Sequence, residues 1–375
     1  MSSETGRSSG IASRISGAAG RAGGAALDRL TTVTGPINRV LQPLANVYNR
    51  LIGGYFGEMN GLQFVLVVGT LVGLLTAPFW GNYALIQAMI AASIWAILAM
   101  GWDIQSGYTG YISFGHSVLS GGAGYTTAML IHNVNPELPM LVTIPVSVLA
   151  ALGIGLLIAL PSLRLSGPYF SLITFVAVLI FYRMMNPLSE YTGGETGLAG
   201  VEKIFDITEP VQSYYLFLLP MLAVAVALLI VARSNIGLIL LAIRENESAV
   251  EAAGINATKF KIWSFMLSSI PMGIGGVLLA HRFGGVDPGS FIVVDNSIEM
   301  IAMAVVGGMG SILGPLGGAF FIILMEDIVL HAFGLDAQLR WAILWIIVLL
   351  ILVFARQGLF RKLWYGLERL GGDRR

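Results

Sequence analysis

Long apolar runs recur along most of the chain and are separated by short polar segments. A helix that crosses the hydrocarbon core of a bilayer needs about 20 mostly apolar residues, and ten runs approach that length. The third is rich in glycine and serine and the eighth is short, so we expect broken or partial spans there. The ten predicted spans are Leu62–Trp80, Leu85–Trp102, Gly110–Ile131, Met140–Leu160, Tyr169–Met185, Tyr214–Ala232, Ile262–Ala280, Ser297–Val306, Pro315–His331 and Trp341–Phe354.

Composition supports an all-α integral membrane protein with about ten transmembrane helices and glycine-rich broken segments. Apolar residues make up 56% of the chain and charged residues 11%, whereas a soluble domain carries roughly 25% charged residues. The mean hydropathy is +0.80. The chain has no cysteine, which excludes a disulfide framework and a thiolate metal site.

Basic residues in the loops predict the orientation. With the N-terminus in the cytoplasm, inner segments hold 17 of the 21 Lys and Arg residues, as the positive-inside rule requires. Both termini are then cytoplasmic, and we expect a multi-pass protein of the cytoplasmic (inner) membrane. The predicted division is a cytoplasmic tail over 1–60, a transmembrane domain over 61–356 and a second cytoplasmic tail over 357–375.

Two interpretations of the N-terminal tail stay open. Its glycine, serine and arginine content is typical of a flexible segment. Alternatively, the arginine repeat at Arg7, Arg14 and Arg21, or the segment Ile37–Leu51, forms an amphipathic helix on the inner leaflet.

Several kinds of chemistry are missing from the sequence. No lysine follows a glycine, so there is no phosphate-binding loop for ATP, and the four histidines lack metal-ligand spacing. There is no basic patch for nucleic acid. The only ionisable residue that we place inside a span, away from its ends, is His116, whereas ion-coupled carriers usually hold charges there. We therefore expect no enzyme activity, no metal and no cofactor in this chain. If the chain transports a solute actively, we expect a partner subunit to supply the energy.

The cytoplasmic stretch Arg233–Lys261 predicts a docking helix. Ala249, Val250, Ala252 and Ala253 form an apolar stripe, glutamates supply the polar side, and Gly254 is a natural helix terminus. A short helix with one apolar face fits a groove on a partner protein. An ordinary interfacial loop is the alternative.

Two glycine-rich segments predict a transport path. Glycine permits close backbone approach and broken helices, whose freed backbone groups can line a cavity. Packing alone is the alternative, and for the histidine the alternative is a hydrogen bond to a neighbouring helix. The predicted path residues are Gly107, Gly110, Ser113, His116, Ser117, Glu299, Gly307, Gly308, Gly310 and Ser311.

The outer loop Asn186–Ser213 is the longest on its side and carries five acidic residues and one lysine. We expect it to be the best candidate surface on that side for contact with a partner protein. A solvated loop without a partner is the alternative.

Five segments resemble the branched-chain amino-acid permease family of ABC importers, and in particular the second of its two paired permeases. They are SGYTGYISFGHSVLSGGAGYT at 106–126, LRLSGPYFSLIT at 163–174, TGGETGL at 192–198, AIRENESAVEAAGIN at 242–256 and SIEMIAMAVVGGMGSILGPLGGA at 297–319.

The resemblance implies three kinds of partner: a second homologous permease, two cytoplasmic ATP-binding subunits that carry ATP and Mg, and an extracytoplasmic substrate-binding protein. The outer loop Asn186–Ser213 is the expected contact for this binding protein. It also implies that substrates are branched-chain or other amino acids, with urea and short amides carried by relatives. One departure from the broader importer pattern is that glycine follows Ala253 at once. The implied ATPase-docking residues of this coupling helix are Arg244, Glu245, Asn246, Glu247, Glu251, Ala252, Ala253 and Gly254.

A passive channel for a small neutral solute such as urea is the competing hypothesis. It fits the uncharged span interiors, but it gives no reason for a docking helix at 244–256.

Overall fold

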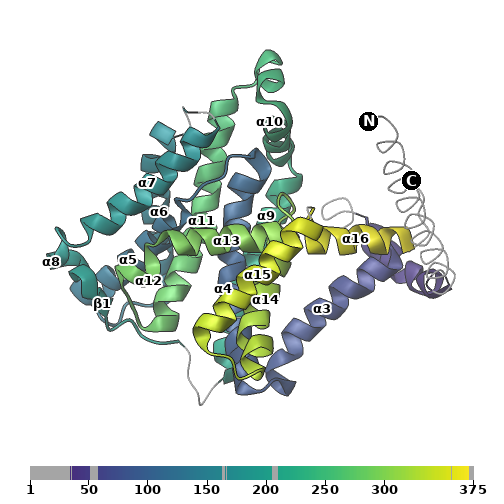
Figure 1. Cartoon of the computed structure of the whole chain (residues 1–375), viewed down its shortest axis with the longest axis horizontal. Helices are drawn as coiled ribbons and strands as arrows, with labels where there is room; N and C mark the ends of the chain where they lie inside the picture. The colour runs from purple at the N-terminus through teal and green to yellow at the C-terminus, as the bar shows by residue number, and fades with distance from the viewer. Residues whose placement is uncertain are drawn as a thin grey trace, which may run out of the picture. The chain divides into compact units, whose positions relative to one another are not determined.

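The computed structural model describes residues 34, 36–50, 58–162, 165, 167–204, 210–355 and 357–370. Within these ranges the chain is almost entirely helical (Figure 1). It divides into two units, one formed by residues 1–75 with 362–375 and the other by residues 76–361. The predicted arginine repeat at Arg7, Arg14 and Arg21 lies outside the described residues.

The smaller unit contains a helical segment over residues 36–50, most of α3 (Gly61–Trp80) and most of α16 (Leu359–Leu370). The part of the predicted amphipathic segment Ile37–Leu51 that is described is therefore helical.

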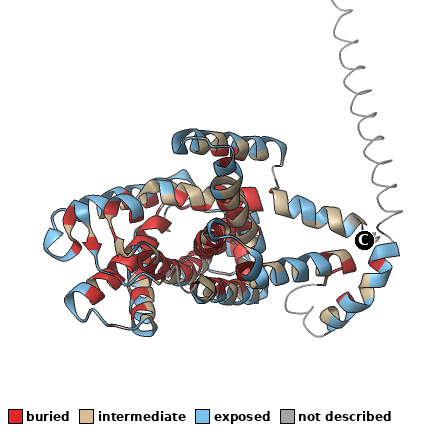
Figure 2. Cartoon of the chain, turned by 90° about the horizontal axis from the view of Figure 1, so that it is seen from below, coloured by how far each residue is buried: buried red, intermediate tan, exposed pale blue. Residues whose placement is uncertain are grey.

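The larger unit is a helical bundle around α4 (Tyr83–Trp102), in which 15 of 20 residues are buried. Its apolar side chains surround the whole helix, and a helix without a polar face is stable only in a protein or lipid interior. It packs against α9, α11, α13 and α14, and buried residues gather at the centre of the bundle (Figure 2). The helices of this bundle, besides α4, are α5 (His116–Asn133), α6 (Met140–Ser162), α7 (Pro168–Met184), α9 (Pro210–Arg233), α10 (Asn235–Ala252), α11 (Ala257–Phe283), α13 (Val294–Gly307), α14 (Leu313–Leu324) and α15 (Ala337–Phe354).

Shorter elements connect these helices. The π-helical segments η2 (Asp103–Gly107) and η4 (Met325–Leu330) extend α4 and α14, and α12 (Pro288–Phe291) precedes α13. The helical turns α8 (Ser189–Thr192) and η3 (Gly194–Thr196) follow α7. The strands β1 (Leu198–Ala199) and β2 (Gly285–Val286) pair antiparallel, with Leu198 opposite Val286.

Each predicted span overlaps a helix, but not every one of these helices is long and apolar enough to be a candidate membrane span. Among the described residues, eight are long and apolar enough, and a ninth counts if α7 and the turns after it, bent by 86°, form one span. The third predicted span was placed too early, because its helix begins at His116 and not at Gly110. The eighth was drawn too short, because α12 and α13 together give a candidate span of 20 residues.

Helix α11 runs the length of the bundle and packs closely against α5 and α6. Its 27 residues correspond to about 40 Å at 1.5 Å per residue. Glycine makes the contact possible, because a side chain on Gly276 would collide with the backbone carbonyl of Ser120 in α5. The β1–β2 pair and α8 lie at one end of α11, and α10 lies at the other (Figure 1).

We predict that Gly276→Ala lowers the thermal unfolding temperature of the purified protein. The added methyl group meets a backbone atom of α5, which can move only if the helix moves. The matched control is Gly153→Ala in α6, where an added Cβ meets no atom within 4 Å. Because alanine is favoured over glycine in a helix by about 0.5–1 kcal/mol, the control is neutral or slightly stabilising. Equal melting temperatures for the two variants would contradict the close α5–α11 contact.

Candidate functional site

A buried carboxylate holds together two segments that are far apart in the sequence. Asp103, at the start of η2, is fully buried. Its Oδ1 accepts a hydrogen bond from the backbone N–H of Gly310 at 2.7 Å. Its Oδ2 accepts from the N–H groups of Ser311 at 3.1 Å and Ile312 at 3.3 Å. The carboxylate therefore binds three successive amides of the loop between α13 and α14.

The loop that Asp103 binds has unusual backbone geometry. Ile312, the residue before α14, has a φ of 41°, the one positive φ at a non-glycine residue among those described. A β-branched residue rarely adopts this region of backbone conformation. The conformation costs of order 1–3 kcal/mol and persists only where the surrounding structure holds it. Ile312 is fully buried, and its N–H is one of the three that Asp103 binds.

The two predicted glycine segments meet at this carboxylate. An added Cβ at Gly107 would collide with the side chain of Asp103 and lie 2.8 Å from the backbone nitrogen of Gly310. At Gly307 it would collide with the carbonyl of Gly314, and Gly308 lies against the backbone at 357–358. Both segments do end helices, as predicted, since α13 ends at Gly307 and Gly110 has a φ of 78°.

Arg244 joins the predicted docking helix to the glycine segments. Its Nη1 donates a hydrogen bond to the carbonyl oxygen of Gly107 at 2.6 Å. It also lies beside Gly310, where an added Cβ would be 2.7 Å from the same nitrogen, and its side chain approaches Gly110. The structure thus places one predicted docking residue against three predicted path residues.

A second contact between α10 and the bundle is an ion pair. Lys261, in the second turn of α11, is buried, and its Nζ lies 2.6 Å from Oε1 of Glu247. The hydroxyl of Tyr111 donates to Oε2 of the same carboxylate at 2.5 Å, and Lys261 Nζ lies 4.4 Å from the tyrosine ring centroid. Burial by itself raises the pKa of Glu247, but the hydrogen bonds from Lys261 and Tyr111 and the lysine charge outweigh it. The pKa of Glu247 is therefore lowered.

The phenol of Tyr111 responds in the opposite direction. Burial, followed by its hydrogen bond to Glu247 and the negative charge of that carboxylate, raises the pKa of Tyr111. The hydroxyl therefore stays protonated as a donor to the carboxylate.

A kink divides α10 between its two anchors. Asn246 has an extended backbone (φ −161°, ψ 95°) inside the helix, and its side chain accepts a hydrogen bond from Ala249 N at 3.0 Å. This is the geometry of an internal N-cap. Arg244 precedes the kink and Glu247 follows it, so the two halves of α10 are attached to the bundle separately.

The second half of α10 presents an exposed surface. Glu245, on the near side of the kink, is also exposed. Gly254 has a φ of 84° directly after the C-cap Ala253, as the predicted helix terminus requires. The predicted apolar stripe divides, because Val250 packs in a cluster with Ile243 and Ala257 of the same chain. The exposed residues of this half and of the turn that follows it are Ser248, Ala249, Glu251, Ala252, Ala253 and Gly254.

His116 is held by neighbouring side chains. Its Nδ1 lies 3.0 Å from Ser113 Oγ, and its Nε2 lies 3.2 Å from Ser268 Oγ on α11. The ring is fully buried, with its centroid 5.3 Å from that of Phe265. These contacts are those of the alternative considered for this histidine, a hydrogen bond to a neighbouring helix. Ser117 lies one residue further along α5 and donates its backbone N–H to Ser297 at 3.1 Å.

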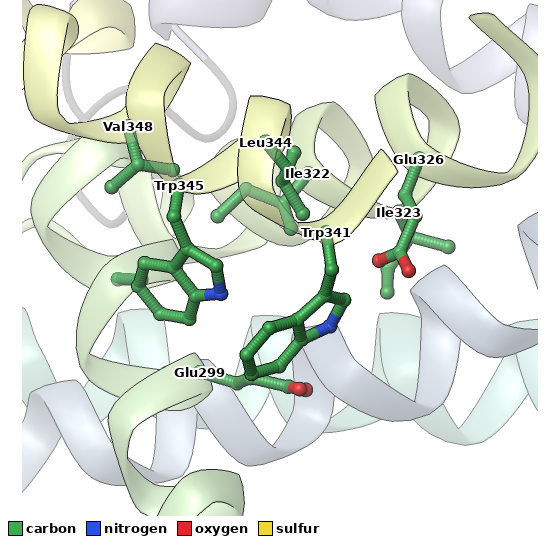
Figure 3. A pocket seen from close by; sticks show the side chains of 9 residues that line it. Glu299, Ile322, Ile323, Glu326, Trp341, Leu344, Trp345 and Val348 are labelled. Carbon is green, nitrogen blue, oxygen red and sulfur yellow. The ribbon is translucent and has the colours of Figure 1, made fainter. Parts of the chain in front are cut away.

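Glu299 lies away from the glycine segments. It is eight residues before the end of α13 and lines a small pocket between α13, α14 with η4, and α15 (Figure 3). Its neighbours there include Glu326, Trp341 and Trp345. The structure therefore brings the glycine residues and Arg244 together but leaves Glu299 in a separate place.

Sequence reasoning missed three residues of this arrangement. Asp103 was visible as an acidic residue at the inner end of a span, and Lys261 as a lysine at the start of another. Tyr111 gave no comparable signal. Among the described residues there is no cluster of three His, Cys, Asp or Glu side chains that could hold a metal ion.

A multi-pass helical membrane protein whose helix-breaking glycine segments are tied to an exposed, kinked helix has the architecture of a membrane permease. The family model described as "Branched-chain amino acid transport system / permease component" matches residues 84–354. The chain belongs to this family and is a permease component of an ABC transporter, a multi-pass protein of the inner membrane.

Curated relatives cover most of the chain at low identity. The high-affinity branched-chain amino acid transport system permease protein LivM of Escherichia coli is 25% identical, over 71% of this chain and 68% of its own. The ribose import permease protein RbsC of Haemophilus influenzae is 25% identical, over 73% and 85%. The branched-chain permease BraD of Pseudomonas aeruginosa is 23% identical, over 74% and 95%. No solved structure matches the chain.

We predict that Asp103→Asn destabilises the protein. The carboxamide replaces one acceptor oxygen with an NH2 group that faces backbone donors, and each buried N–H left unpaired costs about 1–3 kcal/mol. Thermal unfolding of the purified protein measures the loss. Asp336→Asn is the matched control, because Asp336 is exposed and its side chain caps no amide of α15. An Asp103→Asn variant as stable as this control would contradict the role of the carboxylate.

We also predict that the contribution of Glu247 to stability depends on pH. Because the pKa of Glu247 is lowered from its ordinary 4.5 in the folded protein, the stabilisation is present in full above that ordinary pKa. It is lost as the pH falls through the lowered folded value. Unfolding temperatures of the wild type and Glu247→Gln should therefore differ near neutral pH and converge in acid. A difference that is constant over this pH range would contradict the ion pair with Lys261.

Proposed function

We propose that this chain is one permease subunit of an ATP-driven importer for branched-chain or related amino acids. Its partners in this proposal are a second, homologous permease, two cytoplasmic subunits that bind ATP and Mg, and an extracytoplasmic substrate-binding protein. The observation that carries the proposal is the exposed, kinked helix α10, which is anchored to the glycine segments before its kink and to α11 after it.

In this proposal, the contacts of Arg244 and Glu247 connect the ATP-binding subunit mechanically to the transport path. In the proposal, residues 244–256 seat in the ATP-binding subunit, mainly through the exposed Glu251, Ala252 and Ala253. Movement of this segment pulls on Gly107 through Arg244 and on the start of α11 through Glu247. Because the loop at 310–312 is held by Asp103, which begins the same π-helical turn that ends at Gly107, both glycine segments move with it.

The substrate class rests on the relatives. LivM and BraD are named as branched-chain amino acid permeases, and these support amino acids as the first candidate. Sugars are the second candidate, because the ribose import permease RbsC aligns over 85% of its own length. The outer loop Asn186–Ser213 is the proposed contact for the binding protein, and part of it is held to the end of α11 by the β1–β2 pair.

Reconstituted uptake tests the proposal. Proteoliposomes that contain the complete transporter should accumulate labelled leucine when ATP and the binding protein are supplied, and the same vesicles without the ATPase subunits should not. Undiminished uptake without ATPases would support the passive channel instead. Accumulation of ribose but not leucine would favour the second substrate class.

A charge reversal on α10 tests the docking surface in the same assay. Glu251→Lys should reduce ATP-driven uptake several-fold while membrane insertion stays normal, because Glu251 lies on the exposed surface of α10. Glu137→Lys makes the same charge change in the exposed loop between α5 and α6 and should leave uptake unchanged. Normal uptake in both variants would count against docking at α10.

A further inference from the structure

The helical segment over residues 36–50 turns three of its amide side chains toward the start of α3. Asn38 Oδ1 accepts the backbone N–H of Leu62 at 3.2 Å, and Gln42 Oε1 accepts that of Gly61 at 3.0 Å. Asn49 pairs with the backbone of Met59 in both directions, at 2.9 Å each. Asn38 and Gln42 thus satisfy the first amides of α3, which have no partners within their own helix, and Asn49 holds the residue that lies just before it.

The first turn of α3 is fastened to α16 by the same kind of contact. Asn60 and Gln63 cap each other's backbone N–H groups at 3.0 and 2.9 Å. Their side-chain amides then donate to the carbonyl oxygens of Leu367 at 3.0 Å and Trp364 at 3.3 Å. The three helical pieces of the smaller unit are thus joined through buried or half-buried amide side chains.

The outer face of the 36–50 segment is apolar. Ile37, Val40, Leu44 and Val47 are spaced three or four residues apart and form one stripe. Their exposed fractions are 48%, 76%, 55% and 58%. A helix on the surface of a water-soluble domain has the opposite arrangement, with its polar face outward. This segment therefore turns its apolar stripe toward the surroundings, while its three amide side chains bond to the protein.

The adjoining span indicates what those surroundings are. Helix α3 is a candidate membrane span of which only 11% is buried, and its outward residues include Val65, Leu66 and Val72. Such a face is suited to contact with lipid. The 36–50 segment is bonded to the N-terminal end of this span, where the hydrocarbon core gives way to the headgroups. Exposed Arg39 and Arg50 are placed to reach those headgroups.

We propose that residues 36–50 form an interfacial helix whose Ile37–Val40–Leu44–Val47 stripe inserts into the cytoplasmic leaflet beside α3. The binding partner is the lipid surface itself. Apolar burial at the headgroup boundary, together with attraction of arginine to anionic lipid, is the usual physical basis of such helices. The amide contacts to α3 and α16 fix which face the helix presents to the bilayer. This inference does not depend on which substrate the transporter carries.

Site-directed spin labelling tests the proposal directly, because the chain has no native cysteine to block. Val40→Cys, Leu44→Cys and the control Asn46→Cys, which is exposed on the same helix outside the stripe, are labelled in the full-length permease. The labelled protein is placed in nanodiscs of phosphatidylcholine and phosphatidylglycerol. Power-saturation measurements then compare access of oxygen, which concentrates in the bilayer, with access of a water-soluble nickel chelate.

The ratio of oxygen to nickel accessibility should be several-fold higher at positions 40 and 44 than at position 46. A high nickel accessibility at 40 and 44 would place the stripe in water and overturn the proposal. Protection from both reagents in the permease alone would show that the stripe is covered by this chain. Oxygen access that is high in the permease alone but lost in the complete transporter would assign the stripe to a partner subunit, and would also overturn it.

Discussion

A backbone that breaks inside a membrane protein must find partners for its freed amides without help from water. This requirement explains Asp103. The loop at 310–312 leaves the helical pattern between α13 and α14, and three of its N–H groups bind one buried carboxylate. Unpaired amides in a hydrocarbon environment cost several kcal/mol each, so the broken segment persists because the carboxylate is present. The close approach of Gly107 and Gly310 and the positive φ of Ile312 both follow from that attachment.

The kink in α10 is explained by contacts in the same region. An uninterrupted helix would fix the directions of Arg244 and Glu247 relative to each other, three residues apart on one face. The extended residue Asn246 separates them, so each side chain reaches its own partner, a carbonyl in one case and a lysine in the other. The asparagine side chain repairs the break by capping the second half. Asn246 thus allows each half of α10 to reach its own partner and caps the second half.

Much of the fold was predictable because each span needs an apolar run of sufficient length, and length and composition are local properties. The prediction Met140–Leu160 and the helix Met140–Ser162 differ by two residues at one end. The start of α5 was missed because the backbone before it is satisfied by distant groups. Phe114 N, for example, donates to Thr174 Oγ1, and no local pattern announces that contact. The glycine segments were identified as helix breaks, but their meeting at Asp103 joins residues 207 positions apart. The contacts of the three amide side chains of residues 36–50 were hidden for the same reason, since the sequence shows two faces but not which of them meets the protein.

Helix α11 contacts α10 near its beginning and the loop Asn186–Ser213 near its end. Near its beginning, Lys261 binds Glu247 of α10, the proposed docking helix. Near its end, His281 donates to the carbonyl of Glu202 at 2.8 Å, and β2, which follows directly, pairs with the outer loop through β1. In the proposed transporter, α11 links two binding surfaces, and coupling between two binding sites is reciprocal. Whatever factor an outer ligand applies to affinity on the cytoplasmic side, the cytoplasmic ligand then applies to affinity on the outer side. Under that proposal, one helix reports occupancy across the bilayer in either direction.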